Sequence, residues 1–368
     1  MLYHLFYPLA NYNIIFNVFR YVTFRSIAAF LTAFIFAIFL GPKFIKLLKK
    51  NNAVEEASEV RPESHKKKAG TPTMGGLIIL SGLMLSSLLW NNLTSSYILL
   101  LYLSVGILGA LGFLDDYLKN FKHKKDGLIA RYKLYGQIGL GLLVGLYLYY
   151  DPNSVNIAKV SIPFLKNIFL NFGIFFVPFV IFMITATSNA VNLTDGLDGM
   201  AAGNVGLTAL GLAVFSYMKG NFKLATYFNL DYISQGGELT IFIFALIGTI
   251  LGFLWYNTHP AEIFMGDTGS LALGGILAVI TILLREEIVF GIMGFVFVVE
   301  AASSLIQRYY FKYTRRKFGK GNEIRFFLKA PIHHHYEEKG MSEQKIVIRS
   351  WILTTLFVAI GLITLKVR

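Results

Sequence analysis

Long apolar runs alternate with short polar stretches along the whole of this chain. A helix that crosses a bilayer needs about 20 mainly apolar residues, and ten runs meet or approach that length. They cover residues 24–42, 74–92, 97–115, 132–150, 172–191, 199–217, 239–257, 268–284, 288–306 and 349–366. The pattern therefore predicts an all-α polytopic membrane protein with ten transmembrane helices, built as a single integral domain over residues 1–368.

Three further segments have patterns of their own. Residues 1–23 hold one cationic side chain, Arg20, and many aromatic residues. No small-residue cleavage pattern follows the first apolar run, so we expect an interfacial segment and not a cleaved signal. Residues 153–171 alternate in part between apolar and polar side chains, which predicts a small β-hairpin. Residues 307–348 are polar and predict a long cytoplasmic loop.

Composition narrows the class of protein. Of 368 residues, 55% are hydrophobic and only 15% are charged, so most of the chain cannot face water. The chain has no cysteine, which excludes disulfides, thiolate nucleophiles and cysteine-bound zinc. The formal net charge is +13. In a chain this apolar, that charge indicates loops beside anionic lipid and phosphate, and not a nucleic-acid partner.

The distribution of Lys and Arg predicts the orientation in the membrane. Segments 43–73, 116–133 and 307–349 together hold 25 of the 34 basic residues. The positive-inside rule places them in the cytoplasm, and ten spans then place both termini on the periplasmic side. Loops 191–199 and 257–268 lack Lys and Arg, but parity places them in the cytoplasm too. The acidic and histidine motifs of the chain therefore all fall at the cytoplasmic face.

The first of these motifs is the pair Asp115-Asp116 in LGFLDDYLK. Exposed acids at a helix end are the simpler interpretation, but a helix C-terminus disfavours anions. Adjacent carboxylates also repel each other unless a cation is near. Lys119 lies four residues after Asp115 and can pair with it. The motif thus favours a catalytic or metal-binding role.

Two more motifs hold aspartates among glycines. In NLTDGLDG, Asn192, Asp195 and Asp198 lie three residues apart, a spacing that places side chains on one face of a helical turn. In FMGDTGS, Asp267 precedes an apolar run. Helix N-capping is the alternative role for Asp198 and for Asp267 or Thr268. A carboxylate beside free backbone N–H groups can equally hold a hydrated Mg²⁺ and its phosphates.

Histidines and lysines supply the complementary groups. PIHHHYE is internal, and its consecutive histidines cannot all bind one metal if they are helical. Imidazoles suit phosphate contact or proton transfer. KKKAGTPTMGG combines a basic membrane anchor with Gly70, Thr71 and Thr73, which can donate hydrogen bonds to an anion. Glu300 lies inside a predicted span, where acids are usually paired or functional, although it is also close to the cytoplasmic end.

Taken together, these strings resemble the polyprenyl-phosphate N-acetylhexosamine-1-phosphate transferases. The resemblance runs over nearly the whole chain, and PIHHHYE and GTPTMGG are similar to the phospho-N-acetylmuramoyl-pentapeptide transferase branch. It implies ten transmembrane helices, a cytoplasmic active site in the inner membrane and a homodimer. It also implies transfer of phospho-N-acetylmuramoyl-pentapeptide from its UDP carrier to undecaprenyl phosphate, which gives lipid I and UMP, with Mg²⁺ as cofactor.

The resemblance also implies roles for individual residues. Asp267 would be the principal metal ligand, with Asp115 and Asp116 beside the metal and the lipid phosphate. Lys119, Lys133 and His333 would contact phosphates, and His334 would lie near the uridine. The residues that would line the nucleotide pocket are Lys68, Thr73, Asn192, Asp195, Gly196, Leu197, Asp198, Asn257, Phe264 and Met265. The stretch RRKFGKGNEIRFF before the histidine motif is longer than the family pattern, which makes Gln307 harder to place as a pocket residue.

Two alternative functions remain at this point. A sister transferase would move a different amino-sugar phosphate, such as N-acetylglucosamine-1-phosphate. An ion-coupled transporter would hold its charges near the bilayer midplane on broken helices, whereas the charges here fall at helix ends on one face. Whether the lipid phosphate attacks directly or a carboxylate first forms a phospho-enzyme is not decided by the sequence.

Overall fold

The computed structural model describes residues 1–51, 70–122, 124, 127–151, 158–163, 165 and 168–366, and these are mostly helical. The long helices are α2 (Val22–Lys50), α4 (Gly76–Trp90), α5 (Ser96–Asn120), α6 (Ala130–Tyr150), α7 (Phe176–Thr194), α8 (Met200–Lys219), α10 (Gly236–Asn257), α11 (Gly266–Leu284), α13 (Phe295–Phe318) and α15 (Glu343–Ile363). The short elements are α1 (Leu2–Phe6), η1 (Tyr7–Asn11), η2 (Ile14–Arg20), β1 (Lys159–Ser161), β2 (Phe169–Asn171), η3 (Gly173–Phe175), α9 (Phe222–Phe228), α12 (Glu287–Met293) and α14 (Ile332–Glu338).

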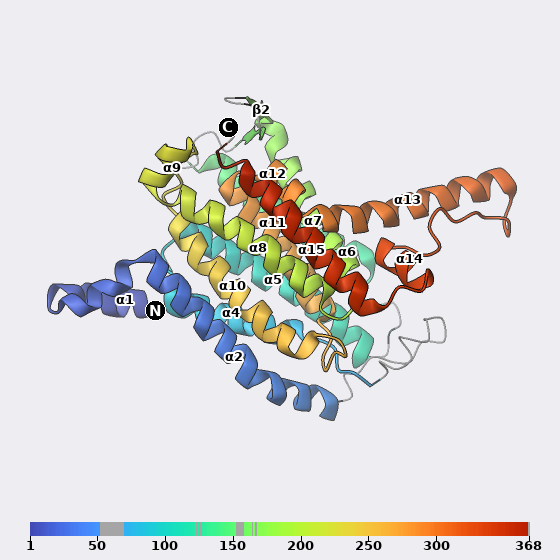
Figure 1. The fold of residues 1–368 in the computed structure, drawn as a ribbon, viewed down its shortest axis with the longest axis horizontal. Coiled ribbons are helices and arrows are strands. Elements are labelled where there is room, and N and C mark those ends of the chain that lie inside the picture. Colours follow the sequence, from blue (N-terminus) through green and yellow to red (C-terminus); the bar gives the residue numbers. More distant parts are fainter. Residues whose placement is uncertain are drawn as a thin grey trace.

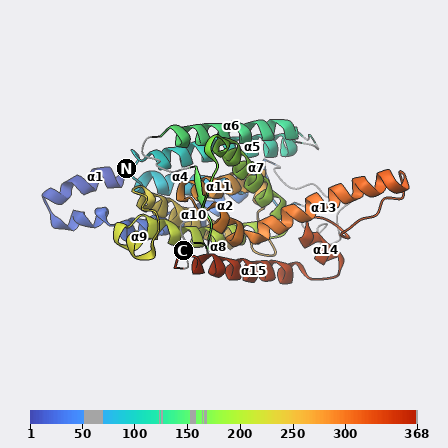
Figure 2. The ribbon, with the colours of Figure 1, turned by 90° about the horizontal axis from the view of Figure 1, so that it is seen from above.

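Helix α11 forms the centre of the bundle. Every residue from Thr268 to Leu284 is buried, because α11 packs against α4, α5, α7 and α8. Figure 2 shows α5 and α6 on one side of the molecule and α15 on the other, with α11 between them. A helix that is apolar on all sides is expected at such a buried position, and this explains the uniformly apolar run after Asp267.

Glycines allow the backbones of α4 and α5 to touch the first turn of α11. A Cβ atom on Gly112 of α5 would lie 2.2 Å from the carbonyl oxygen of Asp267. A Cβ atom on Gly76 of α4 would lie 2.1 Å from the backbone nitrogen of Gly269. Small residues at such contacts are typical of helix packing in lipid. They bring the acidic pair of α5 directly against the start of α11.

Both ends of α11 are held by charged side chains from other helices. At its N-terminus, the Asp116 carboxylate accepts hydrogen bonds from the backbone N–H groups of Asp267 and Thr268 at 3.1 and 2.9 Å. At its C-terminus, the buried Lys219 ammonium donates to the carbonyl oxygen of Leu284 at 2.7 Å and pairs with Glu286 at 2.6 Å. An anion at the start and a cation at the end both complement the helix dipole.

The predicted polytopic all-α architecture is confirmed, whereas the number of spans stays a prediction. Within the described residues, seven helices are long and apolar enough to cross a membrane, or eight if the bent pair α12–α13 counts as one span. Helix α4 has 15 residues, which is about 22 Å at 1.5 Å per residue and shorter than a bilayer core. Helix α6 covers the predicted span 132–150 but is not among the seven.

The predicted span 288–306 is not one continuous helix in the structure. The chain bends by 80° between α12 and α13, where Gly294 has non-helical dihedral angles. Helix α13 then continues to Phe318, into the region predicted as a loop from residue 307. The apolar-run criterion missed this extension because its residues are mostly polar and exposed. Figure 1 shows α13 projecting away from the bundle.

The peripheral segments agree in part with the predictions. Strands β1 and β2 pair antiparallel, so the hairpin expected within 153–171 is confirmed for its described residues. Residues 1–23 form short helical segments in which α1, η1 and η2 bury no side chain; their interfacial location stays a prediction. Both chain ends lie at the end of the bundle that carries α9 and the hairpin, opposite to α14 (Figure 1).

Candidate active site at one end of the bundle

Three carboxylates from two helices meet beside the start of α11. Asp115 and Asp116 of α5 and Asp267 of α11 each offer an oxygen atom within 4.8 Å of the others. Asp115 is fully buried and Asp116 is 4% exposed. Buried carboxylates repel one another unless cations compensate them. The predicted convergence of residues about 150 positions apart in the chain is thus present in the structure.

Two lysines supply that compensation. Lys133 Nζ lies 2.9 Å from Asp115 Oδ1 and 2.5 Å from Asp267 Oδ2. Lys119 Nζ lies 2.5 Å from Asp115 Oδ2 and 3.4 Å from Asp267 Oδ2. The expected pairing of Lys119 with Asp115 is therefore present. Asn192, at the end of α7, donates to the other Asp267 oxygen at 2.9 Å.

Asp116 differs from its two partners because its oxygens face the first turn of α11 and not the lysine ammonium groups. Oδ1 accepts from the backbone of Asp267, while Oδ2 accepts from the Thr268 backbone and from its hydroxyl at 2.5 Å. Asp116 thus caps α11 from a neighbouring helix. The capping role considered for Asp267 or Thr268 is wrong, since α11 has no side-chain cap from its own N-cap residue, Met265. Oxygen ligands suit Mg²⁺, and Asp115 and Asp267, whose oxygens face the lysine ammonium groups, are the carboxylates of this cluster best placed to hold a cation.

The NLTDGLDG segment connects this cluster with two other groups. Helix α7 ends at Thr194 and α8 begins at Met200. Asn192 and Asp198 therefore do not share one helical face, and the expectation that they would is wrong. Asn192 contacts the acidic cluster, Gly196 faces His333, and Asp198 accepts from the backbone of Ala261 at 3.2 Å. Asp198 does not cap α8, whose N-cap is Gly199 without a side-chain bond.

Asp198 belongs to a second cluster that the sequence did not reveal. His259 Nδ1 lies 3.0 Å from Asp198 Oδ2 and 3.5 Å from Glu343 Oε2, and Glu343 also accepts from the Asp198 backbone at 2.8 Å. These three residues could together hold a metal ion by distance. The available signal for His259 was its place in loop 257–268, which lacks Lys and Arg and also contains Asp267. Glu343 had no such signal.

The three histidines of PIHHHYE point to three different partners, as expected for consecutive residues in a helix. His333 is buried, and its Nδ1 lies 2.9 Å from Glu300 Oε2. His334 Nδ1 lies 2.5 Å from Glu337 Oε2. Burial lowers the pKa of His334 below its usual value, although Glu337 opposes that shift, so its neutral form is favoured. His335 Nδ1 accepts from the backbone of Leu328 at 3.1 Å.

The remaining predicted pocket residues do not all lie at the acidic cluster. Thr73 and Phe264 lie at its edge. The Thr73 hydroxyl is 3.1 Å from the position that a Cβ on Gly266 would take, and the Phe264 carbonyl accepts a hydrogen bond from the Gly75 backbone. Leu197, Met265 and Asn257 are buried and serve packing or local hydrogen bonds. Asp195 follows α7 directly. Lys68 lies outside the described residues.

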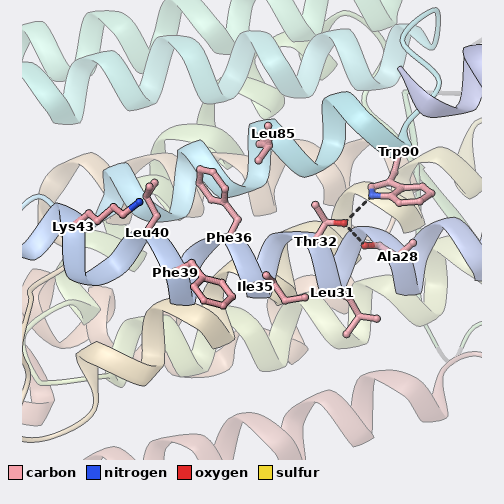
Figure 3. Close-up of a pocket in the computed structure, with 10 residues that line it drawn as sticks. All are labelled: Ala28, Leu31, Thr32, Ile35, Phe36, Phe39, Leu40, Lys43, Leu85 and Trp90. Atoms are coloured by element: carbon pink, nitrogen blue, oxygen red, sulfur yellow. Dashed lines mark hydrogen bonds between the residues drawn. The ribbon is translucent and has the colours of Figure 1, made fainter.

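Two hollows border the described helices. One of about 350 Å³ is lined by Glu300 and His333 among mainly apolar side chains. The other, of about 640 Å³, lies between α2 and α4 and is lined by apolar residues with Lys43 and the Thr32–Trp90 hydrogen bond (Figure 3). No predicted site residue lines the larger hollow. We therefore place the candidate site at the acidic cluster and the histidine motif.

Comparison with known proteins shows which family the chain resembles. The family model for glycosyl transferase family 4 matches residues 98–285, and the signature 1 of phospho-N-acetylmuramoyl-pentapeptide-transferase matches residues 68–80. The phospho-N-acetylmuramoyl-pentapeptide-transferase of Chlorobium chlorochromatii (strain CaD3) is 51% identical over 353 residues, 96% of this chain and 95% of the relative.

Proteins of the same name are similar over comparable lengths. That of Chloroherpeton thalassium (strain ATCC 35110 / GB-78) is 47% identical over 96% of this chain and 95% of its own. That of Chlorobaculum parvum (strain DSM 263 / NCIMB 8327) is 46% identical over 99% of this chain and its full length. Together with its apolar helices, these matches identify the chain as a multi-pass protein of the inner membrane. The chain belongs to the phospho-N-acetylmuramoyl-pentapeptide transferase family, within glycosyl transferase family 4.

Proposed function

We propose that this protein transfers phospho-N-acetylmuramoyl-pentapeptide from UDP-N-acetylmuramoyl-pentapeptide to undecaprenyl phosphate, which yields lipid I and UMP. The observation that carries this proposal is the convergence of Asp115 and Asp267 with Lys119 and Lys133 at one end of a membrane bundle. Both substrates are anions, so their approach requires cations to screen the repulsion between phosphates. The acceptor is a lipid, which explains a reaction centre built on membrane helices.

In the direct route, an oxygen of the lipid phosphate forms a bond to the sugar-linked phosphorus. The bond from that phosphorus to the bridging oxygen breaks, and UMP leaves with the electron pair. Asp115 is the carboxylate that we assign to accept the proton of the lipid phosphate. Lys119 and Lys133 contact phosphate oxygens, and a Mg²⁺ ion bound mainly by Asp267 would stabilise charge on the diphosphate. In the alternative route, a carboxylate oxygen first forms a bond to the sugar-linked phosphorus and UMP leaves with the electron pair of the broken bond. An oxygen of the lipid phosphate then bonds to that phosphorus and releases the carboxylate.

We assign the nucleotide to the turn that follows α7. Asp195, Gly196 and Asp198 lie there, Thr73 and Phe264 border the adjacent acidic cluster, and His334 presents a neutral imidazole. An aromatic contact and a few polar groups are what a uracil ring requires. Lys68, Leu197, Asn257 and Met265 remain assigned to the same pocket by resemblance. His333 is assigned to a phosphate oxygen.

The test is release of UMP from UDP-N-acetylmuramoyl-pentapeptide, measured with and without undecaprenyl phosphate and Mg²⁺. We expect release only with all three present, and a burst of UMP without the lipid would instead support the phospho-enzyme route. UDP-N-acetylglucosamine serves as the second donor, and its preferential use would replace this proposal by the sister transferase. For the Asp267→Asn variant, which should release no UMP, Asp231→Asn is the matched control. Asp231 lies in the chain between α9 and α10 and pairs only loosely with Arg285, at 3.8 Å.

We also propose ten spans, both termini in the periplasm, one integral domain and a homodimer. The positive-inside distribution and the family resemblance support these assignments. The absence of native cysteine makes labelling simple: Ser342→Cys should react from the cytoplasmic side and Lys223→Cys from the periplasmic side. Reaction of both from one compartment would contradict the orientation. Light scattering of the detergent-solubilised protein tests the dimer.

A further inference from the structure

Glu300 is a buried carboxylate that the proposed chemistry does not use. It is 2% exposed and belongs to α13, 33 residues before its partner His333 on α14, which is 1% exposed. Glu300 Oε2 lies 2.9 Å from His333 Nδ1. Burying a carboxylate away from water costs free energy unless it has a hydrogen-bonded, charge-compensating partner. His333 is that partner for Glu300.

The contact determines which ring nitrogen of His333 is available. With Glu300 ionised, its carboxylate only accepts hydrogen bonds, so the hydrogen between the two groups is on Nδ1. Nε2 then remains for another partner, either as an acceptor or, once the ring is charged, as a donor. In the described part of the chain, Nε2 is buried and has no hydrogen-bond partner. A buried polar atom without a partner is uncommon and requires an explanation, of which a bound water or ligand is one.

The free nitrogen faces the segment that connects to the acidic cluster. A Cβ atom on Gly196 would lie 2.3 Å from Nε2, so only glycine leaves this approach open. Gly196 is four residues from Asn192, which holds Asp267 at 2.9 Å. Four residues span at most about 14 Å of chain. His333 Nε2 therefore lies next to the turn where the proposed function places the sugar nucleotide.

A second contact holds the same two helices in register. The Ser303 hydroxyl, on α13, accepts from the backbone of Ile332 at 3.0 Å and donates to the carbonyl oxygen of Glu300 at 2.8 Å. The start of α14 is thus fastened to α13 independently of the Glu300 side chain. This separates two possible roles of Glu300, since holding α14 in place is already served by Ser303.

We propose that Glu300 is a positioning residue that keeps the hydrogen of His333 on Nδ1 and directs Nε2 to an anionic phosphate oxygen of the sugar nucleotide. Its negative charge also stabilises the charged ring once that oxygen is bound, which leaves the buried pair neutral overall. The arrangement is analogous to the carboxylates that orient metal-bound histidines, whose removal costs about 10- to 100-fold in activity. The identity of the ligand rests on the proposed function, whereas the position of the hydrogen on the His333 ring does not.

The test combines Glu300→Gln with ¹⁵N NMR of histidine-labelled protein. In the wild type, we expect His333 to carry hydrogen on Nδ1 without ligand, and its Nε2 resonance to shift when UMP is added. In Glu300→Gln, the amide can either accept or donate, so we expect a mixture of ring forms. We further expect kcat to fall by about 10- to 100-fold with a smaller change in KM.

Ser303→Ala is the matched control, since it loosens the same helix pair and leaves the Glu300–His333 contact. It should keep the Nδ1–H form and nearly all activity. A wild-type ring with hydrogen on Nε2 alone would overturn the proposal, and so would an unchanged kcat in Glu300→Gln. If Glu300→Gln does not fold, Glu300→Asp shortens the carboxylate and should produce the same loss of a single ring form. Because the NMR result needs no turnover, failure of the transferase assay alone would count against the proposed function only.

Discussion

Replacing Asp116 by Asn tests whether this residue acts as a cap or as a catalytic group. Its carboxylate accepts three hydrogen bonds from Asp267 and Thr268 at the start of α11. Asparagine keeps one accepting oxygen, so at least one buried donor loses its partner, and the negative charge at the helix start disappears. Hydrogen bonds to charged groups contribute about 1.5–3 kcal/mol, and an anion at a helix N-terminus contributes about 0.3–2 kcal/mol. We therefore expect a loss of roughly 2–4 kcal/mol.

Two assays measure this loss. At about 2 °C per kcal/mol for a large domain, the apparent melting temperature in detergent should fall by roughly 4–8 °C. Loss of the cap should also displace the first turn of α11, which carries Asp267. The Mg²⁺ concentration for half-maximal UMP release should therefore rise by about 10- to 100-fold. Thr268→Val removes one of the same hydrogen bonds, so its effect should not add fully to that of Asp116→Asn. An Asp116→Asn variant with a strongly reduced kcat but unchanged melting temperature and Mg²⁺ dependence would refute the capping role and return Asp116 to the chemistry.

Three further changes follow from the same geometry. Asp267→Asn should abolish UMP release and retain a folded protein by size-exclusion chromatography; near-normal turnover would remove its assignment as metal ligand. Gly196→Ala would place a methyl group 2.3 Å from His333 Nε2, so kcat should fall at least about tenfold as the ring is displaced, whereas Gly139→Ala, which has open space at its Cβ position, should not change kcat. Gly112→Ala would meet the Asp267 backbone at 2.2 Å and should destabilise the protein by about 1–3 kcal/mol; an unchanged melting temperature would show that α5 and α11 can separate without cost.

The helices were predictable because apolar runs of sufficient length have few alternatives to spanning a bilayer. Each predicted span overlaps a helix or a pair of helices. The bend at Gly294 and the extension of α13 to Phe318 were not predictable by the same rule. A polar helix outside the apolar core has no hydropathy signal. Glycine is frequent within membrane helices in general, so Gly294 alone does not indicate a bend.

That Asp115, Asp116 and Asp267 lie at the same face followed from the positive-inside rule and parity, since each motif borders a predicted span on the cytoplasmic side. The hydrogen-bond partners did not follow from it. Asp116 caps a helix that lies about 150 residues later, and Glu300 orients a histidine on a different helix. Such partners depend on which helices are neighbours and at what height, and residue spacing along the chain carries neither. For the same reason His259 and Glu343 were missed, and the capping role considered as an alternative for Asp198 is not present in the structure.

The position of α11 has a consequence for how the enzyme responds to its membrane. Helices that contact lipid adjust their tilt when bilayer thickness changes. Helix α11 is instead enclosed by protein and is held by Asp116 at its N-terminus and by Lys219 at its C-terminus. The depth of Asp267 is therefore set by neighbouring helices and not by the surrounding lipid. A change of lipid chain length would displace the phosphate of the acceptor relative to a stationary metal ligand, so bilayer thickness should alter the KM for the lipid substrate and leave that for the soluble nucleotide unchanged.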